Sequence, residues 1–157
     1  MDKQSTEFFV AMFVGYLLTV AIETTVLLAL LSRRHPVRLR IFAGLWLTAC
    51  TYPVVWLVLP PAFNERHQYL LVAETFAPVA ECLIFWFAFV RKPAKQPMKI
   101  IANEWSVVPQ PQPVVNRWDT TRDMAAITVA NLCSFGFGEL LHANGWFEAI
   151  LHAVGQQ

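Results

Sequence analysis

Apolar residues run almost without interruption through four long stretches of the chain, separated by short polar segments. A helix that crosses a bilayer needs about 20 mostly apolar residues, and each stretch is close to that length. The pattern therefore predicts an all-α integral membrane four-helix bundle. The predicted spans cover residues 8–31, 41–59, 69–90 and 124–142 of a single polytopic domain, 1–157.

The polar segments predict where these helices begin and end. Thr120 to Asp123 offer side chains that can cap the fourth helix, at the end of a connector over residues 91–123. Asn144 and Gly145 are typical of a helix end. Residues 146–154 then place their apolar side chains on one face, which predicts a short C-terminal helix. That helix suits the membrane interface, and packing against the bundle or a neighbouring subunit is the alternative.

The composition supports a membrane protein and narrows its partners. Hydrophobic residues make up 56% of the chain and charged residues 15%, whereas soluble domains average about 45–50% and about 25%. This excludes an ordinary soluble domain and a disordered chain. A net charge of +1 gives no general attraction for nucleic acid. The expected surroundings are the lipid bilayer, with a second copy of the chain or other membrane subunits as partners.

The basic residues are distributed very unevenly. Ten of the twelve lysines and arginines lie in residues 32–40 and 91–123, which are the connectors on one side of the predicted bundle. Connectors rich in lysine and arginine stay in the cytoplasm. This predicts that both basic loops are cytoplasmic and that both termini lie outside.

The two halves of the chain resemble each other at polar positions. Each half has a glutamate in its first span, a basic pair ten residues later, and a polar cluster in its second span. The matching segments are Ala21-Ile22-Glu23 and Val79-Ala80-Glu81, then Thr48-Ala49-Cys50-Thr51-Tyr52-Pro53 and Asn131-Leu132-Cys133-Ser134-Phe135-Gly136. The match predicts two parallel helical-hairpin repeats related by an axis along the membrane normal. Chance similarity between apolar helices is the alternative.

Six polar residues of the repeat are predicted to form a layer near the membrane centre. At about 1.5 Å per residue, Glu23 lies roughly 12 Å from the basic end of its span, and the other five lie at similar depths. The six are Glu23, Glu81, Thr48, Thr51, Asn131 and Ser134. A charge at the bilayer centre costs at least about 2.5–3.5 kcal/mol on insertion scales, so a lone glutamate there is expected to keep its proton. Proton or cation binding, neutral interhelical hydrogen bonding and partner docking all remain open as roles.

A second polar layer is predicted nearer the outside, from Glu74, Glu139 and His142. Glu139 and His142 are three residues apart and share a helix face, as metal ligands do in some helical bundles, and His67 could approach them. The motif occurs only once, so no metal site is predicted and these residues are weak candidates. No cofactor is expected. Cys50, Cys82 and Cys133 are interpreted as packing residues.

Small and polar residues are expected to face inward, because they let membrane helices approach closely. The large aromatic residues near the end of the third span are then expected to face lipid or a neighbouring subunit. These are Phe85, Trp86, Phe87 and Phe89.

Three functions remain open at this point. The first is a proton- or cation-coupled transport or ion-pathway protein that acts as an oligomer, with Glu23 and Glu81 as its coupling acids. The second is a non-catalytic accessory or assembly subunit of a larger membrane complex. The third is a membrane-embedded metal-dependent enzyme that uses Glu74, Glu139 and His142. An enzyme is the least favoured, since the sequence has no phosphate-binding loop, no nucleophile elbow and no zinc-protease histidine pair.

Overall fold

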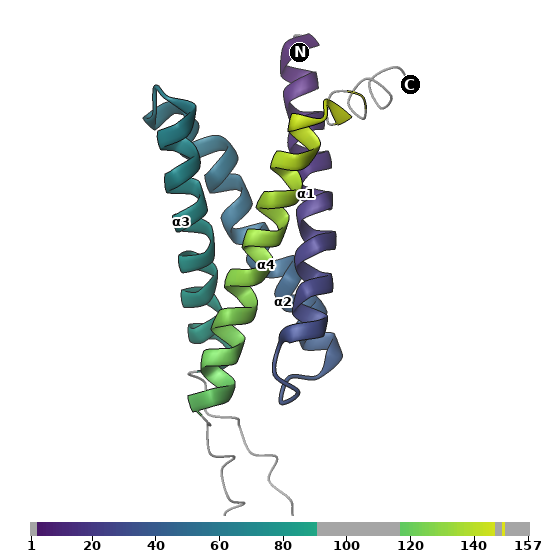
Figure 1. Ribbon diagram of the computed structural model, residues 1–157, viewed down its shortest axis with the longest axis vertical. Coiled ribbons are helices and arrows are strands. Elements are labelled where there is room, and N and C mark those ends of the chain that lie inside the picture. Colours follow the sequence, from purple (N-terminus) through teal and green to yellow (C-terminus); the bar gives the residue numbers. More distant parts are fainter. Residues whose placement is uncertain (1–2, 91–116, 147–148, 150–157) are drawn as a thin grey trace, which may run out of the picture.

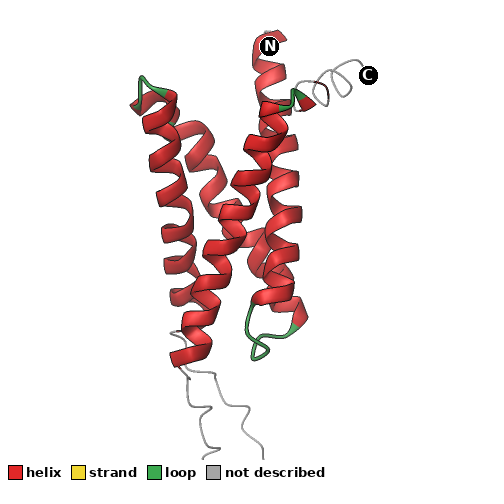
Figure 2. Ribbon diagram, in the orientation of Figure 1, coloured by secondary structure: helices red, strands yellow, loops and turns green. Residues whose placement is uncertain are grey.

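The structure, a computed structural model, describes residues 3–90, 117–146 and 149. Its described part consists of helices joined by short loops (Figure 2). The four long helices are α1 (Lys3–Leu30), α2 (Val37–Pro53), α3 (Arg66–Phe85) and α4 (Arg117–Ala143). Three short helical segments complete the described part: the π-helical η1 (Val54–Val58), the 3-10 helix η2 (Pro60–Ala62) and the π-helical η3 (Trp86–Val90).

The prediction of four long apolar helices is confirmed. The described part of the chain has four helices that are long and apolar enough to cross a membrane. The second such stretch includes η1 and η2, and the third includes η3. The change to π-helical geometry follows directly after Pro53, which cannot donate a backbone hydrogen bond. Leu59 accordingly bonds to the carbonyl of Val54, five residues back.

The helices form a bundle in which α2 and α4 cross between α1 and α3 (Figure 1). Helix α2 begins beside α1 and ends near α3, whereas α4 begins beside α3 and ends beside α1. Both α1 and α3 therefore pack against α2 and against α4. Every long helix can contribute side chains to the centre of the bundle.

The apolar core lies on the side of the bundle nearest the α1–α2 loop. Its largest fully buried apolar side chains are Phe85, Leu27, Leu31, Leu47 and Ile127. The expectation that Phe85 faces lipid is wrong, because this ring is fully buried and lies 5.4 Å from the ring of His35. Phe85 is four residues after Glu81, so the two share the inward face of α3.

Close approach between α1 and α2 depends on a glycine. A Cβ atom added at Gly44 would fall against the side chain and the Cα atom of Thr24. Small residues allow this kind of contact between membrane helices. The inward orientation expected for the small-residue faces of α1 and α2 therefore agrees with the packing at this position.

The beginning of α4 differs from the sequence-based expectation. The helix begins at Arg117, so Thr120 and Asp123 lie within it and do not cap it as expected. The Thr121 hydroxyl donates to the Arg117 carbonyl inside the helix, at 3.0 Å. Residues 117–123 therefore belong to α4 and not to the connector. Hydroxyl and carboxylate side chains can bond within a helix or across to another segment as well as cap it, and the sequence alone does not decide between these.

The expected end of α4 is confirmed. The helix ends at Ala143, and Gly145 has a φ of 67°, in the left-handed region that favours glycine. The predicted C-terminal helix over residues 146–154 lies mostly outside the described residues. Residues 91–116 of the predicted connector also lie outside them.

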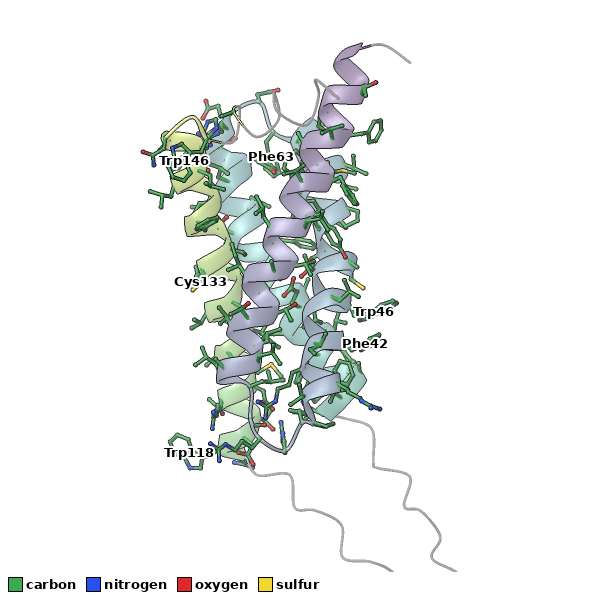
Figure 3. All side chains as sticks on the ribbon, turned by 90° about the vertical axis from the view of Figure 1, so that its right-hand side faces the viewer. Phe42, Trp46, Phe63, Trp118, Cys133 and Trp146 are labelled. Carbon is green, nitrogen blue, oxygen red and sulfur yellow. The ribbon has the colours of Figure 1, made fainter. Side chains whose placement is uncertain are left out.

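The outer surface of the bundle is apolar. Figure 3 shows Phe42, Trp46 and Cys133 projecting away from the helices. Phe42 and Trp46 stack on each other at 5.8 Å between ring centroids, and both are half exposed. Such a surface is unfavourable in water and is solvated well by lipid tails.

Candidate functional site

Glu23 of α1 lies at the centre of the bundle and is 3% exposed. The Thr48 hydroxyl of α2 donates to its Oε2 atom at 2.5 Å. The Ser134 hydroxyl of α4 donates to its Oε1 atom at 2.9 Å. One buried carboxyl therefore joins three helices.

Glu81 of α3 occupies the corresponding place on the other side and is 2% exposed. The Thr51 hydroxyl of α2 donates to its Oε1 atom at 2.8 Å. The Asn131 side-chain amide of α4 donates to its Oε2 atom, also at 2.8 Å. Each glutamate is thus bonded to α2 and to α4 at the same time.

These contacts bring together the six residues placed at one depth by sequence, here named the central polar layer: Glu23, Glu81, Thr48, Thr51, Asn131 and Ser134. Each glutamate is bonded to the second helix of its own hairpin, Glu23 to Thr48 and Glu81 to Asn131. The structure adds a bond from each glutamate to the opposite hairpin. The crossing of α2 and α4 in Figure 1 explains this, since both helices pass between α1 and α3.

The hydroxyl donors of this layer each have a second acceptor nearby. Thr48 Oγ1 lies 2.7 Å from the Gly44 carbonyl oxygen, and Thr51 Oγ1 lies 3.1 Å from that of Leu47. A hydroxyl has a single hydrogen, and a carbonyl oxygen has none. Both contacts of Thr48 are hydrogen bonds at once only when Glu23 carries a proton and donates it to Thr48.

The layer can therefore accommodate a glutamate in either protonation state. With an ionised Glu23, the Thr48 hydroxyl turns its hydrogen toward the carboxylate. With a neutral Glu23, the same hydroxyl turns to the Gly44 carbonyl and accepts from the acid. Thr51 offers the same alternatives to Glu81. No partner is lost in either state.

A cavity of about 130 Å³ lies against this layer, and its lining includes both Glu23 and Glu81. Glu74 and Tyr52 also line it. The volume is large enough for several water molecules or for a small hydrated cation. The two carboxyls are thus buried among helices and still border a space that a small ligand can occupy.

A larger cavity of about 640 Å³ adjoins the first and extends to the end of the bundle that carries Arg66 and His142. The two cavities share Thr19, Glu74 and Ser134 in their linings. On the opposite side of the layer lies the apolar core around Leu27 and Phe85. The central polar layer therefore lies between a cavity and a packed core.

The three residues of the second predicted layer, Glu74, Glu139 and His142, all line the larger cavity. The Glu139 carboxyl accepts a hydrogen bond from Arg66 at 3.0 Å, whereas the Glu74 side chain makes no hydrogen bond to another described residue. His142 is exposed at the end of α4 and lines the larger cavity. Within the described ranges, no three histidine, cysteine, aspartate or glutamate side chains are grouped so that they could hold a metal ion. His67 therefore belongs to no such group.

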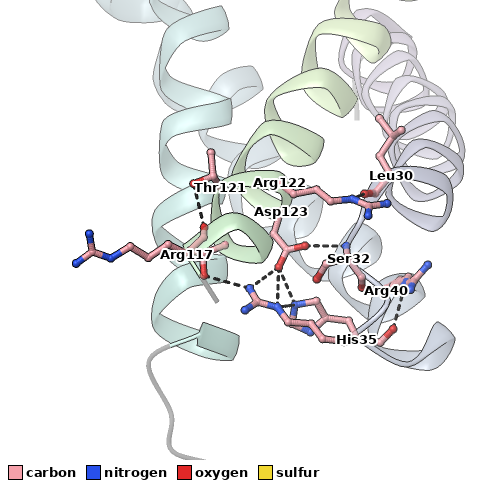
Figure 4. Close-up of polar contacts among 10 residues, drawn as sticks. Leu30, Ser32, His35, Arg40, Arg117, Thr121, Arg122 and Asp123 are labelled. Carbon is pink, nitrogen blue, oxygen red and sulfur yellow. Dashed lines mark hydrogen bonds and ion pairs between the residues drawn. The ribbon is translucent and has the colours of Figure 1, made fainter. Parts of the chain in front are cut away.

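Sequence reasoning missed a third buried carboxylate, Asp123 of α4, which is 0% exposed (Figure 4). Its Oδ2 atom accepts from Arg34 at 2.5 Å and lies 3.0 Å from Nε2 of His35. Its Oδ1 atom accepts from the backbone N–H of Ser32 at 2.8 Å. Asp123 therefore ties α4 to the α1–α2 loop, and we name these four residues the loop clamp.

Two further arginines strengthen the same end of the bundle. Arg40 donates to the carbonyls of Leu28, Ser32 and His35. Arg122 donates to the Leu30 carbonyl at 2.9 Å (Figure 4). Carbonyls at a helix C-terminus lack partners within the helix and attract cations. Part of the basic cluster that predicts membrane orientation therefore also closes the end of α1.

Fold and site together define a multi-pass, all-helical membrane protein with buried carboxyls at the centre of its bundle. Compared with known proteins, the chain matches no family model, no curated protein and no solved structure. The central polar layer and its cavities are therefore the features that bear on function.

Proposed function

We propose that this protein is a membrane transport or ion-pathway protein in which Glu23 and Glu81 bind and pass on a proton or a small cation. One observation carries the proposal. Two buried carboxyls, held only by neutral hydroxyl and amide donors, border a cavity that adjoins a larger one. Ionisable residues inside membranes commonly mark ion or proton pathways. Donors that can serve both protonation states suit groups that gain and lose a proton.

We also propose that the two hairpins are parallel repeats. The hydrogen bonds support this, because exchanging the two halves exchanges the two sets of bonds. Each glutamate binds the first polar residue of its own hairpin, Thr48 or Asn131, and the second of the other hairpin, Ser134 or Thr51. The two acids would then be equivalent members of one layer.

The proposed orientation follows from the basic residues. The α1–α2 loop and the start of α4 would face the cytoplasm. In that orientation, the larger cavity is open to the outside, and the apolar core and the loop clamp lie on the cytoplasmic side. The structure would then correspond to an outward-facing state. Passage of an ion to the cytoplasm would require the apolar core on the cytoplasmic side to open.

Flux through purified protein in liposomes tests the proposal. A potassium gradient with valinomycin drives protons inward, and an entrapped pH dye reports their entry. Parallel vesicles report Na⁺ and K⁺. We expect ion flux in the wild type and its loss in Glu23→Gln and Glu81→Gln, because glutamine keeps hydrogen-bonding atoms and cannot ionise.

Glu65→Gln serves as the matched control, since Glu65 is exposed at the start of α3 and lies outside both cavities. Its flux should equal that of the wild type. Wild-type vesicles that carry no more flux than empty liposomes would overturn the proposal. Undiminished flux in both glutamine variants would also overturn it.

Finally, we propose that the protein acts as an oligomer that packs through α4. Cys133 and Gly136 are exposed on this helix, and a Cβ atom at Gly136 would meet nothing within 4 Å. Oxidation of membranes with copper phenanthroline should join Cys133 of two copies, and Cys133→Ser should abolish the product. A monomer mass in mild detergent with no Cys133 product would contradict this arrangement.

A further inference from the structure

The larger cavity has the size and walls of a small-molecule site. Its volume of about 640 Å³ falls within the range of about 300–1,000 Å³ typical of such sites. Helices α1, α3 and α4 and the segments η1 and η2 contribute to its lining. Aromatic side chains are prominent in the walls, among them Phe8, Trp56, Tyr69 and Phe135.

Charge is distributed asymmetrically along this space. Three carboxyls line the deep part, Glu74 in both cavities and Glu23 and Glu81 in the smaller one. Of the described residues that line the two cavities, only Arg66 is a lysine or arginine, and it is paired with Glu139 at 3.0 Å. A ligand that reaches the deep part therefore meets acids without a neighbouring base.

A further polar group at this depth has no partner. The Tyr52 hydroxyl is buried and makes no hydrogen bond to any described residue, and Tyr52 contributes to the lining of the smaller cavity. A buried hydroxyl without a partner is unfavourable, so an occupant of the smaller cavity that offers a polar atom would stabilise it.

From these observations, we propose that the larger cavity binds a lipophilic organic cation, such as a bulky amine or a quaternary onium ion. Its apolar groups would lie between the aromatic walls near Trp56, and its positive charge would lie toward Glu74. Attraction between a cation and an aromatic ring adds to the attraction of the carboxylates. The inference rests on the proposed function, since such a cation would be the substrate whose transport is coupled to the ion that Glu23 and Glu81 pass on, but its test measures binding alone.

Two probes of nearly equal shape and opposite charge distinguish cation binding from non-specific hydrophobic binding. Tetraphenylphosphonium is a cation and tetraphenylborate an anion. Equilibrium dialysis of the full chain in neutral detergent, against empty micelles, measures saturable binding of each. We expect about one phosphonium per chain and no saturable borate.

Glu74→Gln should weaken phosphonium binding about tenfold or more, because it removes a desolvated charge from the binding cavity. The Glu74 side chain makes no hydrogen bond to another described residue, so the substitution leaves the central polar layer intact. Glu65→Gln is the control and should bind as the wild type does. Saturable borate binding of equal affinity, no saturable phosphonium binding, or unchanged binding in Glu74→Gln would each overturn the inference. Ion flux without phosphonium binding removes this inference alone, whereas phosphonium binding without flux removes the proposed transport alone.

Discussion

The central polar layer and the loop clamp bury the same chemical group in different ways. Glu23, Glu81 and Asp123 are all almost completely buried. Among the described residues, the two glutamates accept only from hydroxyls and an amide. Asp123 accepts from an arginine and a backbone N–H, and also contacts a histidine. One region pairs its acids with neutral donors, and the other pairs its acid with a permanent cation.

This difference indicates which acid can change its charge. Protonation of Asp123 would leave the Arg34 guanidinium without its counter-ion, so the clamp favours one state. Protonation of Glu23 or Glu81 leaves every partner bonded, because the hydroxyl hydrogens can turn to the neighbouring carbonyls. The clamp is therefore suited to holding α4 in place, and the layer is suited to binding and releasing a proton.

The largest expected effect comes from breaking the clamp. Asp123→Ala leaves Arg34, His35 and the Ser32 N–H facing an empty position. Removing one partner of a buried ion pair costs about 3–5 kcal/mol. We expect the free energy of unfolding to fall by about this amount, measured by SDS titration in micelles with far-UV circular dichroism.

Asp119→Ala is the matched control, since Asp119 lies one turn earlier in the same helix and is only half-buried. Its unfolding free energy should change by less than about 1 kcal/mol. Equal losses in the two variants would show that the Asp123 contacts add nothing beyond a general effect of charge near the start of α4.

An intermediate effect is expected when a glutamate of the central layer is truncated. Glu23→Ala removes the acceptor of two donors, and hydrogen bonds in membranes average about 0.6 kcal/mol each. The space left by the missing side chain adds to this cost, so we expect the free energy of unfolding to fall by about 1–3 kcal/mol. Glu23→Gln should cost less than about 1 kcal/mol in the same titration, because the amide keeps polar atoms at both positions. A loss in Glu23→Gln as large as that in Asp123→Ala would contradict the comparison between the two regions.

Helical rise and repeat matching were enough to place the six central residues at one depth. They could not reveal the bonds between hairpins, because these depend on how α2 and α4 cross. The burial of Phe85 was predictable from the sequence, since Phe85 is four residues beyond Glu81 on the same helix face. The burial of Asp123 was not predictable, because its partners lie 88 to 91 positions away in the chain. Nothing in the local sequence distinguishes Asp123 from a capping residue.

If the two glutamates are equivalent, their bonds to the opposite hairpins should have similar and smaller energies. Double-mutant cycles between Glu23 and Ser134, and between Glu81 and Thr51, isolate the two bonds that join opposite hairpins. Each coupling should be about 0.6 kcal/mol, and the two should agree within about 0.5 kcal/mol. Both coupling energies are measured by SDS titration. In these cycles, glutamine replaces each glutamate, alanine replaces Ser134 and valine replaces Thr51. Strong coupling in one pair and none in the other would contradict the proposed repeat.

The smallest effect is expected at the opposite end of the bundle, where Arg66 pairs with Glu139 at 3.0 Å. The two side chains are 60% and 39% exposed, whereas Arg34 and Asp123 of the clamp are 24% and 0% exposed. Exposed ion pairs contribute about 0–1 kcal/mol, and salt screens them. A double-mutant cycle with Arg66→Gln and Glu139→Gln should therefore give less than about 0.5 kcal/mol at 0.15 M salt. A coupling as large as that between Arg34 and Asp123 would mean that burial does not set the strength of ion pairs in this bundle.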